Sequence, residues 1–190
     1  METLILWTGI ANHSLENCVL THSDENIEVN SVIVGAHDDK IYRVDYSIKT
    51  NRDWESIFLE VKAQLPDKKS EINFHSDGRG NWTKSGVPVN EFGGCIDIDI
   101  SLTPFTNSLP INRLQWELNK PQQIKVLFLD ILSQEIIPVQ QRYTKLSNTE
   151  YKFENVPNDF EAIITVDESG MVVNYPELFV RRRKRYYQEY

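Results

Sequence analysis

The chain has 190 residues, a net charge of −8 and a pI near 5.0. This acidic balance argues against general nucleic-acid binding, because contacts to phosphate need basic surface. Charged residues make up 25% of the chain, as in ordinary soluble domains. No apolar run approaches the ~20 residues that a membrane-spanning helix needs, and the N-terminus lacks a basic and then apolar leader. We therefore predict a cytoplasmic protein.

The length favours a single domain, which we place at residues 1–180, followed by a basic and aromatic C-terminal tail at residues 181–190. The simplest interpretation of the cations in this tail is a solvated segment or a strand edge blunted by charge. The alternative is a contact with anionic lipid head groups, at about 1 kcal/mol per basic residue. The cations concerned are Arg181, Arg182, Arg183, Lys184 and Arg185.

Alternation of apolar and polar residues predicts strands almost throughout. Residues 41–48 place Tyr42, Val44, Tyr46 and Ile48 on one face, and residues 113–118 alternate in the same way. Residues 124–132 form a longer apolar run, typical of a strand covered on both faces. About a dozen such strands separated by turns indicate an all-β barrel, sandwich or roll. We expect at most one or two short helices, near residues 108–114 or 64–70.

The most informative segment begins with a strand at residues 95–102. Its isoleucines face one way, while Asp97 and Asp99 share the other face, ~6.6 Å apart along the strand. A turn with two prolines follows and ends at Arg113, the first guanidinium within reach of the two acids. We predict that Arg113 is at least partly buried and bonded to Asp97, Asp99 or carbonyl groups of residues 103–110. A planar guanidinium could then hold the turn shut with several donors.

Three interpretations of the two acids remain open. The first is solvent exposure next to a cross-strand cation. The second is a polar lining in which the acids and Arg113 bind the hydroxyls of a sugar or head group. The third is a hydrolase or isomerase that acts through Asp97, Asp99 or Glu16 on a sugar- or lipid-like substrate. The separation of the two aspartates fits inverting glycosidases, but neighbours on one strand acquire it from backbone geometry alone.

Other candidate residues have plain structural interpretations beside their functional ones. Thr103 and Asn107 suit turn chemistry, and they could also line the mouth of a pocket. Aromatic residues such as Trp54, Tyr143 and Tyr175 can fill the core or form the walls of a ligand cavity. The two cysteines are far apart and the four histidines show no metal-ligand spacing, so we predict neither a disulfide nor a metal site nor a cofactor.

The dodecapeptide TPFTNSLPINRL at residues 103–114, preceded by CIDIDIS, resembles the signature of the putative glycolipid-binding family of small bacterial proteins. The resemblance implies a spiral β-roll and a glycolipid ligand. Asn112 departs from the pattern, because a second arginine is expected beside Arg113. Outside the signature the resemblance extends over Trp7, Ser14, Glu16, Gly35, residues 46–54, Gly78, Gly80, Trp82, residues 141–143, Val166, Asp167, Gly170, Tyr175 and Pro176.

Together, these observations predict an all-β spiral roll or half-open barrel of mostly antiparallel strands. We expect a non-enzymatic protein that binds an amphipathic ligand, a glycolipid or another lipid with a polar head. The two alternatives are the hydrolase or isomerase, and an interaction or structural protein without a small ligand. No residue is assigned a catalytic role, and the oligomeric state is left open. The predicted ligand-binding residues are Asp97, Asp99, Thr103, Asn107, Arg113, Trp54, Tyr143 and Tyr175.

Overall fold

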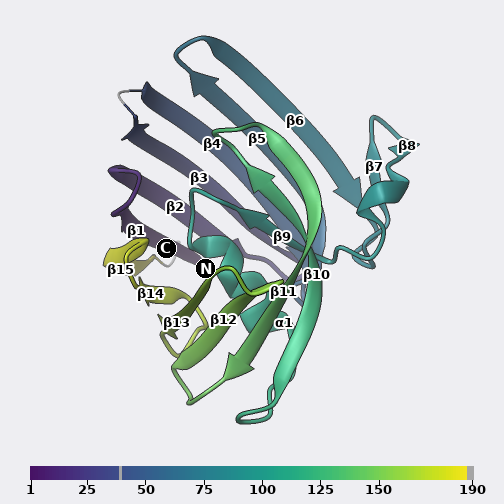
Figure 1. Cartoon of the computed structure of the whole chain (residues 1–190). Helices are drawn as coiled ribbons and strands as arrows, with labels where there is room; N and C mark the ends of the chain where they lie inside the picture. Colours follow the sequence, from purple (N-terminus) through teal and green to yellow (C-terminus); the bar gives the residue numbers. More distant parts are fainter. Residues whose placement is uncertain (39, 188–190) are drawn as a thin grey trace.

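A computed structural model describes residues 1–38 and 40–187 and confirms an all-β fold. Fifteen strands form one curved sheet that rolls over without closing into a barrel (Figure 1). The strand order is β8-β7-β6-β5-β4-β3-β2-β1-β15-β14-β13-β12-β11-β10-β9, so neighbours in the sequence are mostly neighbours in the sheet. All pairs are antiparallel except β9 and β10, which run parallel.

The first half of the sheet is an antiparallel meander of six long strands, here called the first meander. Small strands β7 (Trp82–Lys84) and β8 (Val87–Pro88) and the 3₁₀-helix η1 (Asn90–Phe92) extend it at one edge. The six strands are β1 (Glu2–Gly9), β2 (Ser14–His22), β3 (Asn26–His37), β4 (Lys40–Asn51), β5 (Ser56–Leu65) and β6 (Lys68–Ser76).

The second half, here called the second meander, repeats the same architecture. Its last strand pairs with β1, which joins the two meanders into one sheet. Residues 181–187 therefore belong to a central strand, and residue 180 is not a structural boundary. Residues 188–190 of the predicted tail lie outside the described residues. The strands are β10 (Pro121–Asp130), β11 (Glu135–Lys145), β12 (Glu150–Val156), β13 (Glu161–Val166), β14 (Val172–Tyr175) and β15 (Phe179–Tyr187).

Between the meanders lies the signature segment, residues 95–114. It contains β9 (Asp97–Ile100), the 3₁₀-helix η2 (Phe105–Asn107) and α1 (Ser108–Arg113), which confirms one of the two predicted helices. The other predicted helix, at residues 64–70, is instead the β5–β6 hairpin.

The predicted strand at residues 113–118 was wrong. Trp116 and Leu114 pack against the second core without a neighbouring strand, and the Trp116 indole donates to the carbonyl of Ile111 at 2.9 Å. Leu118, the third apolar residue of the pattern, is exposed. Extended chain over a core produces the same alternation as a strand, so the pattern alone did not separate the two.

The two meanders have different cores. In the first, alternate residues such as Val29, Ile33, Val44 and Ile48 form a largely aliphatic interior. In the second, the interior is rich in aromatic rings that contact one another edge to face. The rings of the second core are Tyr143, Tyr151, Phe153, Tyr175 and Phe179.

Candidate functional site

Asp97 and Arg113 form an ion pair within the signature segment. The Arg113 guanidinium donates from Nε to Asp97 Oδ1 at 3.0 Å and from Nη2 to Oδ2 at 2.6 Å. The Asp97 side chain is fully buried and that of Arg113 is 14% exposed. Burial raises the pKa of Asp97, and the guanidinium opposes this shift. Arg113 is thus partly buried and bonded to Asp97 as predicted, although it reaches the acid from the end of a helix rather than from a returning strand.

Asp99 lies two residues further along β9 and contacts the second meander. Its Oδ2 accepts a hydrogen bond from Gln141 Nε2 on β11 at 2.6 Å, and its Oδ1 accepts one from Thr106 at 3.2 Å. Burial raises the pKa of Asp99, while the bonds from Gln141 and Thr106 lower it. No cation pairs with Asp99 among the described residues. Its carboxyl group is therefore available to a ligand that can supply donors.

Asp99 lines a cavity of about 280 Å³ between the signature segment and the second meander, here called the Asp99 cleft. Polar atoms stand at one side and aromatic rings form much of the rest, a combination suited to a sugar. A second cavity of about 210 Å³ shares Asp99, Phe128 and Asn155 with it and continues toward β11 and residues 156–159. The cleft is lined by Asp99, Ile100, Ser101, Thr103, Asn107, Phe128, Phe153, Asn155, Phe160, Tyr175, Leu178 and Phe179.

Four of the predicted ligand-binding residues line this cleft: Asp99, Thr103, Asn107 and Tyr175. Tyr143 supports it from behind, because its hydroxyl donates to Asn107 Oδ1 at 3.0 Å. Asp97 and Arg113 are outside the lining and position β9 against α1 instead.

Trp54 lies elsewhere. It follows β4 in the turn before β5 and contacts the ring of His22 edge to face, with ring centroids 6.0 Å apart. It lines neither of the two cavities that contain Asp99. Conversely, the sequence analysis did not single out Phe128, Phe153, Phe160 or Asn155, which do line the cleft. Phe128 lies in the apolar run recognised at residues 124–132, but its position beside Asp99 depends on the pairing of β9 with β10, which no local pattern records.

Glu16 forms a second buried polar group behind the cleft. Its Oε1 accepts hydrogen bonds from Ser31 at 2.8 Å, Tyr46 at 2.6 Å and Thr103 at 2.9 Å. Its Oε2 is buried and has no partner among the described residues. Burial raises the pKa of Glu16 to about 7, against the three hydroxyl donors that lower it. Because no cation is close, this carboxyl group is best accommodated with a proton on Oε2.

Glu16 does not line the Asp99 cleft, although Thr103, to which it is bonded, does. Sequence analysis considered Glu16 only as a possible catalytic acid. The strand pattern contained a clearer signal, because Glu16 is in phase with Cys18 and Leu20 and so had to face the core.

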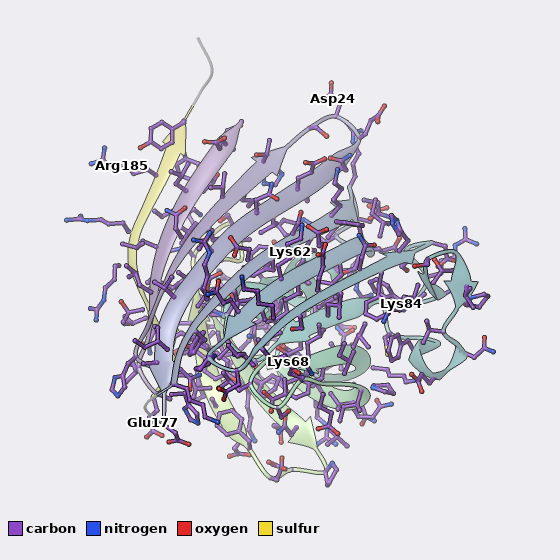
Figure 2. The ribbon with its side chains drawn as sticks, turned by 90° about the horizontal axis from the view of Figure 1, so that it is seen from above. Asp24, Lys62, Lys68, Lys84, Glu177 and Arg185 are labelled. Carbon is purple, nitrogen blue, oxygen red and sulfur yellow. The ribbon has the colours of Figure 1, made fainter. Side chains whose placement is uncertain are left out.

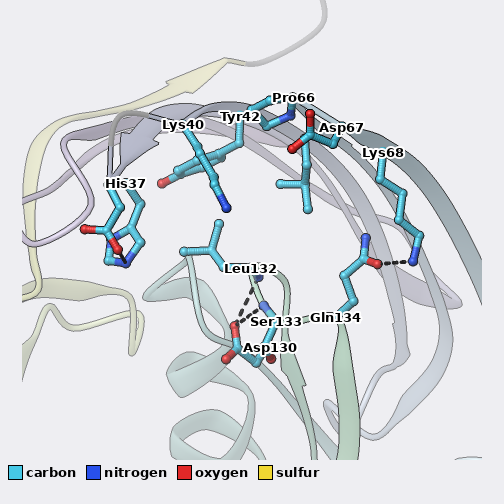
Figure 3. A pocket seen from close by; sticks show the side chains of 12 residues that line it. His37, Lys40, Tyr42, Pro66, Asp67, Lys68, Asp130, Leu132, Ser133 and Gln134 are labelled. Atoms are coloured by element: carbon cyan, nitrogen blue, oxygen red, sulfur yellow. Dashed lines mark hydrogen bonds and ion pairs between the residues drawn. The ribbon is translucent and has the colours of Figure 1, made fainter.

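A larger depression of about 490 Å³ lies where the β3–β4 and β5–β6 hairpins meet the β10–β11 hairpin. Figure 3 shows Lys40 and Tyr42 above Leu132, and a hydrogen bond from Lys68 to Gln134 across one side. It contains none of the predicted site residues, and its lysines are offset by Asp38, Asp67 and Asp130. Its mixed charges do not indicate one class of ligand, whereas the lining of the Asp99 cleft does.

None of the helices in residues 1–38 and 40–187 is long and apolar enough to span a membrane. The same residues contain no group of three histidine, cysteine or acidic side chains arranged to hold a metal ion. Cys18 and Cys95 are both buried and unbridged.

The fold and the site define an all-β roll whose signature segment closes a small aromatic cleft around one carboxyl group. The chain belongs to the family described as "Putative glycolipid-binding", whose model matches residues 4–181. It is also similar to the crystal structure of a DUF1089 family protein from Pseudomonas aeruginosa, with 31% sequence identity and a TM-score of 0.80. That match covers 89% of this chain and 92% of the other. No curated protein matches the chain.

Proposed function

We propose that this protein binds a glycolipid, or another lipid with a hydroxyl-rich head, and that the Asp99 cleft receives the head group. The observation that carries the proposal is the composition of the cleft. Asp99 offers a half-buried carboxyl group without a cation, Asn107 and Asn155 offer amides, and aromatic rings face them. Carboxylates and amides bind vicinal hydroxyls, while aromatic faces stack on sugar rings. The family description supports the same ligand class.

With the head group bound at Asp99, the lipid portion would lie beside apolar side chains of the cleft. Leu178 and Phe179 line the cleft where β14 turns into β15. Apolar side chains beside a polar floor suit a molecule whose head and tail differ in polarity. The cytoplasmic location stays a prediction and is compatible with a lipid ligand that reaches the protein from a membrane surface.

No observation favours the hydrolase alternative over binding. Only Asp99 of the two signature aspartates lines the cleft, and both oxygens of Asp97 are taken by Arg113. Burial shifts the pKa of both acids in the same direction, whereas a catalytic acid and base need pKa values that are driven apart.

The test begins with native mass spectrometry and lipid extraction on protein purified from its own host, which would identify a retained ligand. Binding of that lipid, or of its free head group, is then measured for Asp99→Asn and for Trp54→Phe. We expect Asp99→Asn to weaken binding at least about tenfold, because a charge-assisted hydrogen bond is lost. Trp54→Phe, outside the cleft, should bind as the parent does. Equal binding by the parent and Asp99→Asn would disprove the proposed site.

A further inference from the structure

The outer side of β1, β2 and β3 carries several aliphatic side chains where a solvated sheet would carry polar ones. In the cross-strand register Leu15 of β2 is directly opposite Val34 of β3, and their exposures are 46% and 47%. Leu4 is opposite Val19 in the neighbouring pair of strands. Residues directly opposite in antiparallel strands share one face of the sheet. This outer apolar face consists of Leu4, Leu6, Leu15, Val19, Val32 and Val34.

Arginines of β15 border the outer apolar face. Arg183 is opposite Leu6 and Arg185 is opposite Leu4, so both lie on the outer side. Both are exposed and have no ion-pair or hydrogen-bond partner among the described residues. Figure 2 shows Arg185 pointing away from the body of the molecule. Arg182, at the bulge between the Leu6–Arg183 and Trp7–Arg181 pairs, donates to Thr8 at 3.0 Å and is also exposed.

The other two cations of the run belong to the inner side and are neutralised there. Lys184 is opposite the buried Ile5, and it contacts Asp167 at 2.9 Å. Arg181 binds the same carboxylate. Burial of Asp167 acts to raise its pKa, but the bonds from Lys184, Ser169 and Arg181 hold that pKa well below its usual value. The strand thus divides one run of basic residues into an inner structural pair and three outer arginines.

We propose that the outer apolar face and its arginines, Arg182, Arg183 and Arg185, dock the protein on a membrane surface rich in anionic lipids. Lipid phosphates would meet the arginines, and the aliphatic side chains would contact the upper acyl region. Cations next to aliphatic groups match this layered chemistry, in which polybasic attraction adds to apolar burial.

Two other occupants fit the face less well. A nucleic acid would satisfy the arginines but leave Leu15 and Val34 against a charged backbone. A second copy of the chain, related by a two-fold axis, would bring the face against itself. Of the acidic side chains next to this face, Asp45, opposite Val32, and Glu28 are already paired with Arg43 and Lys49, which leaves Glu2 against the three arginines of the other copy. Because the whole chain carries a net charge of −8, attraction to an anionic membrane must come from a local basic region such as these arginines.

Vesicle co-sedimentation tests the proposal with the whole protein. Vesicles of phosphatidylcholine alone are compared with vesicles that also contain phosphatidylglycerol. We expect binding only to the anionic vesicles, and we expect it to weaken as salt is added, because screening shortens the reach of the arginines. The double variant Arg183→Glu with Arg185→Glu should lower the partition coefficient at least about tenfold. Leu15→Ser with Val34→Ser should lower it without any change in charge.

The matched control is Lys120→Glu with Lys152→Glu, which changes the net charge by the same amount just before β10 and on β12, where both cations already face acidic partners. It should retain more binding than the β15 variant, and thermal melts confirm that each variant folds. Equal loss in both double variants would overturn the proposal in favour of a bulk-charge effect. Absence of vesicle binding, or a dimer that the Leu15 and Val34 changes dissociate, would overturn it as well. These outcomes are independent of ligand binding in the Asp99 cleft, so failure of one proposal does not imply failure of the other.

Discussion

The signature segment is attached to the two meanders by different chemistry. Toward the first meander, Thr103 meets Glu16, a carboxyl group surrounded by hydroxyls and without a cation. Toward the second, Asp99 and Asn107 meet Gln141 and Tyr143 and leave room for the cleft. Within the segment itself, Asp97 is buried as deeply as Glu16 but is paired with Arg113.

The difference shows two ways to bury an acid. A guanidinium compensates the charge of Asp97, so the acid can remain ionised, but the pair then depends on both members. Hydroxyl donors compensate Glu16 only in part, and the acid is best kept protonated. The first arrangement ties the acid to a fixed partner, Arg113. The second gives an attachment whose strength follows pH.

The largest loss of stability is expected when the Arg113 cation is removed. Arg113→Ala leaves Asp97 buried without a partner, and we expect a loss of about 3–5 kcal/mol in the free energy of unfolding. For a chain of this size the melting temperature should fall by about 10 °C. Differential scanning calorimetry measures the effect. Arg43→Ala removes the exposed bond to Asp45 and should leave the melt nearly unchanged; a melt of Arg113→Ala that matches the parent would show that the pair is not structural.

Glu16→Gln should change how the stability of the protein depends on pH. The folded state raises the pKa of Glu16 from 4.5 to about 7, so it binds this proton more tightly than the unfolded chain does. The contribution to stability is therefore complete below about pH 4.5, declines as pH rises to about 7, and totals about 3 kcal/mol.

Urea unfolding of the parent and of Glu16→Gln across this range measures the difference. The variant should lose this part of the slope, because an amide does not titrate, and should match or exceed the parent above about pH 7. Parallel pH profiles for the two proteins would contradict a titrating Glu16. Other acids, such as Asp97, are present in both proteins and cancel in the comparison.

The smallest effect should come from the second meander. Tyr143→Phe removes the hydroxyl that donates to Asn107 and should cost about 1 kcal/mol. Chemical denaturation measures this cost. Because Asn107 lines the Asp99 cleft, ligand affinity should fall in the same variant, while Tyr42→Phe, whose hydroxyl contacts the carbonyl of Asn12 in the first meander, should leave affinity unchanged. The reverse pattern would show that Asn107 is held by other contacts.

Local patterns were sufficient for much of the fold. Tyr42, Val44, Tyr46 and Ile48 alternate in the sequence, and all four are buried in β4. The contact between Asp97 and Arg113 was also predictable, because the acid and the guanidinium are only 16 positions apart in the chain. Both inferences depend on residues that are near one another in the chain.

What could not be predicted depends on distant pairing. The parallel contact of β9 with β10 brings Phe128 beside Asp99 and so creates one wall of the cleft. The pairing of β15 with β1 places Arg183 beside Leu6 across most of the chain. Neither register leaves a local mark in the sequence, since each strand looks the same whatever its neighbour. The basic run was therefore expected as a tail.

The pairing of β15 with β1 also has a consequence for synthesis on the ribosome. The first strand emerges early, and β2 can cover only one of its edges. Its other edge keeps unpaired amide and carbonyl groups until residues 179–187 have been made. The open edge of β1 in the first meander is therefore paired only after nearly the whole chain has been translated. A nascent chain stalled before β15 would present that edge to any other extended peptide nearby.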